Sequence, residues 1–286
     1  MRMKAACGFF LTAVSHGGAS EEQAYSMPDT KVIELPTASN GVDYELYVYE
    51  PPTCREANAS CPVVYLLDAE YSFPLAAAMI DHLSGRGRIK PVVAISIAYQ
   101  DKTQYRLNRT RDYTPADFPT GGYGPEYQKH SGGGPNFLEI LERQILPAAE
   151  AAISARVASR ALVGHSYGGL FAAYAWNARP HLFDDYIIVS PSLWYAEGKY
   201  LAETERTCAE NKSGKGARFI LEVGAYEEQP QNGRAMVSDL SRFNDLLKSC
   251  GARKTETYFR VFEDETHASI FPAALSTGLR KLFGAE

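Results

Sequence analysis

Three residue types that cooperate in nucleophilic catalysis, a serine, a carboxylate and a histidine, follow one another along this chain. Ser166 stands in "LVGHSYGGL", where an apolar run that predicts a strand gives way to a stretch that predicts a helix. A strand-to-helix turn of the G-x-S-x-G type holds a serine hydroxyl exposed at the carboxyl edge of a sheet. Gly164 and Gly168 favour this turn, because a side chain at either position is expected to clash. The pattern therefore predicts that Ser166 is a nucleophile rather than part of a glycine-rich packing turn.

His267 is the predicted base for this serine. A serine hydroxyl becomes nucleophilic when a base takes its proton, and an imidazole with an ordinary pKa of about 6.5 suits that task. His267 follows the predicted strand at 255–262, near the C-terminus, where the chain order serine, acid, histidine places the base. The alternative is a surface histidine that caps a helix. His165 directly precedes Ser166, but adjacent side chains diverge, so we expect it to pack beneath the turn.

The acid of the triad is expected in the loop after the predicted strand at 218–224. Glu227 and Glu228 stand there in "AYEEQP", and Asp264 is a third candidate. A carboxylate would hold the imidazole in place and stabilise the imidazolium that forms during attack. Glu227 is favoured, although two adjacent glutamates in a loop are often simply solvated.

Two backbone N–H groups are needed to bind the oxyanion that develops on the substrate. One is expected at Tyr167, directly after the nucleophile, where the N-terminus of a helix adds its positive dipole end. The second is expected at Glu70, in the loop after the predicted strand that ends in "VVYLLD". Backbone donors have no residue-type signature, so Glu70 depends on its place in the topology and on the resemblance described below.

Composition is typical of an ordinary globular protein. The 286 residues are 45% hydrophobic and 22% charged, with a net charge of −5 and no long basic stretch. A nucleic-acid partner would need a clustered cationic face, so none is expected. Neither a C-x-x-C nor an H-E-x-x-H spacing occurs, so we expect no metal and no other cofactor.

The N-terminus has the three-part pattern of a secretory signal peptide. Basic residues in "MRMK" precede the short apolar core "AACGFFLTAV" and the small residues of "SHGGAS". We therefore expect residues 1–19 to be a signal peptide and the mature chain, 20–286, to be periplasmic or secreted. The alternative is a frayed apolar terminus. No later segment approaches the roughly 18 apolar residues of a membrane helix, so no membrane span is expected.

The cysteines fit an exported protein. Losing Cys7 with the signal leaves Cys54, Cys61, Cys208 and Cys250. Pairing 54–61 and 208–250 would restrict the unfolded chain by roughly 2.5 and 4 kcal/mol. Four cysteines allow three pairings, and four buried free thiols are the alternative.

Predicted strands alternate with predicted helices along the chain. Strands are expected at 31–36, 43–52, 62–68, 91–99, 160–164, 185–190, 218–224 and 255–262, and helices at 75–83, 137–152, 170–177, 236–248 and 269–283. This alternation predicts an α/β protein in which a mostly parallel central sheet has helices on both faces. One domain over residues 20–286 is the simplest organisation.

The segment at about 99–135 departs from this rhythm and is expected to be a long active-site loop. It is rich in Gly, Pro, Tyr and Arg, and it follows a central strand at the carboxyl edge of the sheet, where open α/β folds bind ligands. Arg109 and Arg111 could bind an anionic or aromatic acyl group there. The alternative for Arg111 is a structural pair with Asp112. Trp194, in "SPSLWY", is expected to line the pocket wall.

Several longer stretches together resemble the enterochelin-esterase-like branch of the α/β-hydrolases. They include "YLLDAEYSF", "RTRDYTP", "LVGHSYGGLFAAYAW", "LFDDYIIVSPSLWY", "LEVGAYEEQ" and "ETHASIFPAAL", from about Val32 to Phe283. The resemblance implies an α/β-hydrolase fold and carboxylic-ester hydrolysis without a metal. The family's serine, histidine and glutamate fall on Ser166, His267 and Glu227.

This chain departs from the family pattern at one place near the active serine. Ala69 stands where relatives commonly carry glycine, and its methyl group would narrow the oxyanion loop.

The resemblance makes a small-molecule ester the expected partner, with a catecholate-trilactone siderophore as one candidate. An acyltransferase on the same scaffold and a non-catalytic binding protein are the competing classes.

Overall fold

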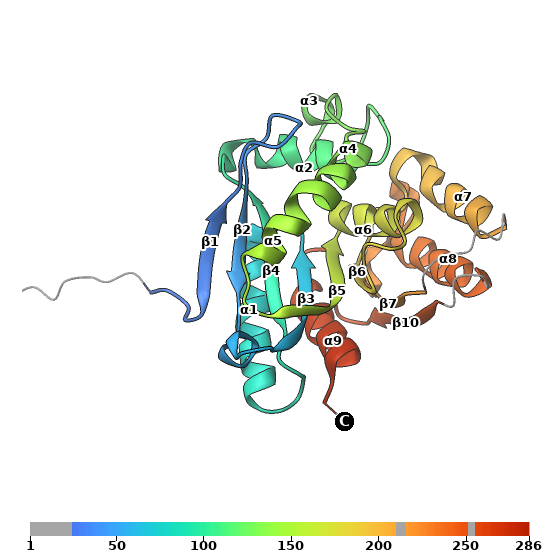
Figure 1. The fold of residues 1–286 in the computed structure, drawn as a ribbon. Helices are drawn as coiled ribbons and strands as arrows, with labels where there is room; N and C mark the ends of the chain where they lie inside the picture. Colours follow the sequence, from blue (N-terminus) through green and yellow to red (C-terminus); the bar gives the residue numbers. More distant parts are fainter. Residues whose placement is uncertain (1–24, 210–215, 251–254, 286) are drawn as a thin grey trace, which may run out of the picture.

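The computed structural model describes residues 25–209, 216–250 and 255–285. Eight strands form one sheet in the order β1-β2-β4-β3-β5-β6-β7-β10 (Figure 1). The strands are β1 (Thr30–Glu34), β2 (Tyr44–Tyr49), β3 (Ser60–Leu66), β4 (Val93–Tyr99), β5 (Arg156–His165), β6 (Asp185–Val189), β7 (Arg218–Gly224) and β10 (Glu256–Phe262). In this order, the six neighbouring strands β4, β3, β5, β6, β7 and β10 are parallel to one another. Strand β1 is antiparallel to β2, and β2 is antiparallel to β4.

The central strands are apolar runs because both of their faces are covered. In β3, Val63 and Tyr65 belong to one buried cluster and Val64 and Leu66 to another. Successive side chains of a strand point to opposite faces, so the two clusters are the two cores on either side of the sheet.

Helices cover both faces (Figure 1). On one face lie α1 (Ala69–Gly85) and α9 (Phe271–Phe283), and on the other lie α2 (Tyr105–Tyr113), α4 (Gly134–Ile140), α5 (Leu146–Ala151), α6 (Tyr167–Ala178), α7 (Tyr195–Ala209) and α8 (Met236–Ser249). A π-helical turn at Leu141–Ile145 joins α4 to α5, where Pro147 has no N–H to donate. The predicted mostly parallel sheet with helices on both faces is confirmed. Within the described ranges, every helix is too short or too polar to cross a bilayer.

Three helices, α2, the short α3 (Pro125–Gln128) and α7, were not predicted from the sequence. The segment expected to be a long active-site loop at about 99–135 contains α2 and α3. In α2, most of the buried side chains are polar, namely those of Asn108, Arg109, Thr110 and Asp112. An apolar period cannot reveal such a helix. The other unpredicted helix is α7, where Ala196, Glu197 and Gly198 have positive φ and interrupt the helical pattern.

Both predicted disulfides are present. Cys54 pairs with Cys61 just before β3, and Cys208 pairs with Cys250 to join the ends of α7 and α8.

The predicted signal peptide, residues 1–19, lies outside the described residues. A small hairpin of β8 (Glu228–Gln229) and β9 (Arg234–Ala235) follows β7.

Candidate active site

Ser166 occupies a strained turn between β5 and α6. Its φ of 61° and ψ of −120° lie in a region that side-chain-bearing residues rarely adopt, at a cost on the order of 1–3 kcal/mol. The turn is held by its backbone: Ser166 N donates to Val189 O at 3.1 Å, and Ser192 N donates to Ser166 O at 3.1 Å.

The glycines of the turn have different roles. A Cβ on Gly164 would collide with the carbonyl of Gly168, so glycine is required there. A Cβ on Gly168 would meet Asp68 Oδ2 at 3.4 Å, which is ordinary van der Waals contact. The clash predicted at Gly168 is therefore wrong, because helix α6 turns this position toward a wider space.

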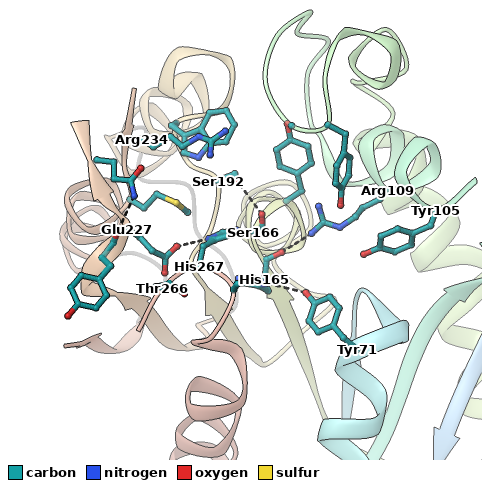
Figure 2. Close-up of a pocket in the computed structure, with 18 residues that line it drawn as sticks. Tyr71, Tyr105, Arg109, His165, Ser166, Ser192, Glu227, Arg234, Thr266 and His267 are labelled. Atoms are coloured by element: carbon teal, nitrogen blue, oxygen red, sulfur yellow. Dashed lines mark hydrogen bonds and ion pairs between the residues drawn. The ribbon is translucent and has the colours of Figure 1, made fainter. Parts of the chain in front are cut away.

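A cavity of about 650 Å³ opens beside Ser166 at the carboxyl ends of the parallel strands, the edge where α/β folds bind ligands. Figure 2 shows Ser166, His267 and Glu227 together at its centre. Six of the predicted site residues line it: Ser166, Tyr167, His267, Glu227, Arg109 and Trp194.

His267 and Glu227 form a short hydrogen-bonded pair. Nδ1 of His267 lies 2.5 Å from Glu227 Oε2 (Figure 2). The other oxygen of Glu227 accepts hydrogen bonds from Ser190 Oγ at 2.6 Å and from Gly224 N at 2.8 Å. With its side chain only 2% exposed, the Glu227 carboxylate is fixed in one orientation.

The other two candidate acids lie elsewhere. Both oxygens of Glu228 are used at the start of α8, where they accept from the N–H groups of Val237 and Ser238 and from the Ser238 hydroxyl. Glu228 therefore satisfies free N–H groups at a helix N-terminus. Asp264 is exposed to solvent and does not line the cavity.

The two predicted oxyanion donors have unequal support from the geometry. Tyr167 begins α6, so its N–H has no acceptor within the helix, and the residue lines the cavity. Glu70 lies in the first turn of α1, with its carboxylate 3.7 Å from Lys102 Nζ, and it is not among the lining residues.

Arg109 and Arg111 make different ion pairs. Arg109 donates to both oxygens of the buried Asp68, at 2.6 and 2.8 Å, and to the carbonyl of His165 at 3.1 Å. It thus joins the end of β3 to the active-site turn while still lining the cavity. Arg111 does not line the cavity, and its guanidinium pairs with Asp112. We therefore leave Arg111 out of the site.

Sequence reasoning missed several residues here. The His165 ring packs against Tyr71 and Phe271, and the residue also lines the cavity, which was not predicted. Ser192 Oγ lies 3.5 Å from Ser166 Oγ. The motif "SPS" directly after β6 could have indicated Ser190 and Ser192, since it lies at the carboxyl edge of the strand next to β5.

A serine on such a turn, with a histidine–carboxylate pair in the same cavity, is the arrangement of an α/β serine hydrolase. Comparison with known families agrees. The model of the Esterase family matches residues 37–282, so this chain belongs to that family and is a carboxylic ester hydrolase.

Its relatives include several siderophore esterases. The chain is 26% identical to the ferri-bacillibactin esterase BesA of Bacillus subtilis over 93% of each chain. It is 28% identical to the siderophore triacetylfusarinine C esterase of Aspergillus fumigatus, over 78% of this chain and 81% of the relative. Among solved structures, an IroE-like serine hydrolase from Shewanella oneidensis matches with a TM-score of 0.77 at 26% identity, over 89% of this chain and 80% of the other.

Proposed function

We propose that this protein cleaves its ester through an acyl-enzyme formed on Ser166, with His267 as the base and Glu227 as the acid. The observation that carries the proposal is the 2.5 Å contact between His267 Nδ1 and Glu227 Oε2 in the cavity that holds Ser166. A carboxylate on Nδ1 fixes the tautomer that leaves Nε2 without a proton and free to accept one.

The reaction follows from these positions. His267 Nε2 takes the hydroxyl proton as Ser166 Oγ attacks the carbonyl carbon, and Glu227 stabilises the imidazolium that results. The N–H of Tyr167 binds the oxyanion, and Glu70 remains the proposed second donor. His267 then gives the proton to the departing alcohol oxygen. Water, deprotonated by the same imidazole, attacks the acyl carbon; the bond to Ser166 Oγ then breaks, His267 returns the proton to Oγ, and the acid is released.

For the substrate, we propose a siderophore lactone of the catecholate-trilactone class. The names of the relatives assign siderophore esters to them, and this cavity has features that suit a planar anionic group. Arg234 lies over the ring of Trp194 at 5.2 Å from its centroid, and both residues line the cavity. Among the described residues, Arg234 has no carboxylate partner. Its charge is therefore free to attract an anion.

Ser166→Ala tests the nucleophile. We expect this variant to lose hydrolysis of p-nitrophenyl acetate and labelling by a fluorophosphonate, while its circular dichroism spectrum stays unchanged. Ser249→Ala, at an exposed position outside the cavity, is the matched control and should keep full activity. Activity retained in Ser166→Ala would refute the assignment.

A substrate panel tests the class of ester. Catecholate trilactones, feruloyl sugars and simple acetates are compared by kcat/KM, and the trilactone is expected to be the best substrate. Adding a sugar acceptor separates hydrolysis from acyl transfer: a hydrolase releases the free acid, whereas an acylated sugar as the main product would identify a transferase.

We also propose that the protein is exported. The two disulfides suit an oxidising compartment, and the pattern of residues 1–19 suits a signal peptide. N-terminal sequencing of the protein from the periplasm or the medium should begin near residue 20. An intact Met1 on cytosolic protein would contradict export.

A further inference from the structure

His165, the residue before the nucleophile, has contacts that the reaction described above does not use. Its ring lies 4.6 Å from the ring of His267, centroid to centroid, with an interplanar angle of 34°. Aromatic rings attract one another at centroid separations of about 4.5–7 Å, in offset-stacked or edge-to-face arrangements, and these two rings pack at a tilt. Figure 2 shows His165 next to His267, between it and Tyr71. One face of the proposed base is therefore covered by a second imidazole.

The His165 ring is itself held in place. Its Nδ1 shares a hydrogen bond with the hydroxyl of Tyr71 at 3.1 Å, and that hydroxyl lies 3.2 Å from Asp68 Oδ2. Tyr71 and Phe271 also contact the ring edge-on and at a tilt, at 6.1 and 5.7 Å. The His165 imidazole is thus a fixed surface, supported by α1 and by the first residue of α9.

His267 has less support of its own. It lies in the loop between β10 and α9, and its side chain is 43% exposed. The hydrogen bond fixes the distance between His267 Nδ1 and Glu227 Oε2. It does not by itself fix the tilt of the imidazole plane about the line that joins these two atoms. A fixed ring packed against His267 limits this rotation, because turning the His267 ring would lose the contacts between the two tilted rings.

From these contacts we propose that His165 is a positioning residue: its ring packs against the ring of His267 and limits the orientations that the imidazole can take beside Ser166. This inference rests on the proposed function, since it assigns the base to His267.

The protonation state of His165 agrees with this role. Burial, followed by the neighbouring His267 and Arg109, holds the pKa of the His165 imidazole well below its ordinary value. Its Nε2 is enclosed by the surrounding protein. A neutral ring supports His267 without repelling the imidazolium that forms during turnover, whereas a charged side chain would oppose it.

The test compares two apolar replacements of similar size. His165→Phe keeps a ring face, and His165→Leu removes it. With p-nitrophenyl acetate, we expect His165→Leu to lower kcat about tenfold or more, because misplacement of a catalytic group reduces rate steeply. KM should change little, since ground-state binding is unaffected. His165→Phe should restore most of kcat, and His181→Ala, at an exposed site outside the cavity, should match the wild type.

A second readout does not depend on catalysis. In proton NMR spectra, stacking displaces the resonances of the His267 ring protons through the ring current of His165. This displacement should remain in His165→Phe and disappear in His165→Leu. Equal kcat values for the two variants, or equal ring-proton shifts, would overturn the proposal. If the wild type cleaves no ester, the proposed function fails, and the NMR comparison still decides whether the stacking exists.

Discussion

Replacing Glu227 with glutamine reverses the hydrogen bond on which the proposed base depends. Ser190 Oγ and Gly224 N both donate to Glu227 Oε1, so the carbonyl oxygen of a glutamine must take that position. The NH₂ group then faces His267 Nδ1, which can only accept. The imidazole proton is thereby moved to Nε2, and His267 can no longer take the proton of Ser166.

The magnitude follows from two losses. A hydrogen bond to a charged group contributes about 1.5–3 kcal/mol, which corresponds to roughly 10- to 150-fold in rate. The wrong tautomer adds to this, and the comparable amide substitution in a serine protease triad lowers kcat by about 10⁴. We therefore expect kcat to fall by about 10³–10⁴ in Glu227→Gln. Glu227→Ala should be milder, at about 10², because water can enter the space and either tautomer can form.

The assay is hydrolysis of p-nitrophenyl acetate, corrected for the fraction of folded enzyme. Glu228→Gln is the matched control, because the neighbouring glutamate contacts α8 and not His267, and it should keep the wild-type kcat. Activity of Glu227→Gln within tenfold of the wild type would show that the histidine works without its acid. Glu227→Ala less active than Glu227→Gln would refute the tautomer argument.

Three further predictions concern stability. Burial raises the pKa of Glu222 to about 8, so the folded state keeps a proton that the unfolded chain releases between about pH 4.5 and 8. The free energy of unfolding should therefore fall with rising pH across this window, by up to about 1.4 kcal/mol per pH unit, and Glu222→Gln should remove this slope. Replacing Cys208 and Cys250 with serine should lower the free energy of unfolding by about 4 kcal/mol, given the 42-residue separation. Arg109→Met leaves Asp68 buried without its partner and should cost about 3–5 kcal/mol.

Urea denaturation checks all three stability predictions. For Glu222→Gln the comparison is made from pH 5 to pH 8, and an identical slope in both proteins contradicts the raised pKa. For the cysteine pair, an unchanged midpoint would mean that the disulfide adds nothing. For Arg109→Met, adding Asp68→Asn should recover part of the loss, because it removes the stranded charge; no recovery would argue against the ion pair as the cause.

The sequence predicted most of the sheet and the region of the nucleophile. Runs such as "PVVAISIAY" are apolar without interruption because parallel strands are buried on both faces, and each predicted strand has its counterpart in the structure. Helix α2 was missed because it buries Arg109 and Asp112. Polar residues are stable inside a protein when tertiary partners satisfy them, and those partners leave no local pattern.

Local information therefore determined the order of the elements, the proposed roles of Ser166 and His267, and the loop in which an acid should lie. The sequence favoured Glu227 over the adjacent Glu228, but only the tertiary structure shows that Glu227 contacts His267 while Glu228 contacts the start of α8. The tertiary structure also brought His165 against His267, two residues about a hundred positions apart. Such choices depend on how separate segments pack, and packing distances are fixed only when the whole sheet has formed.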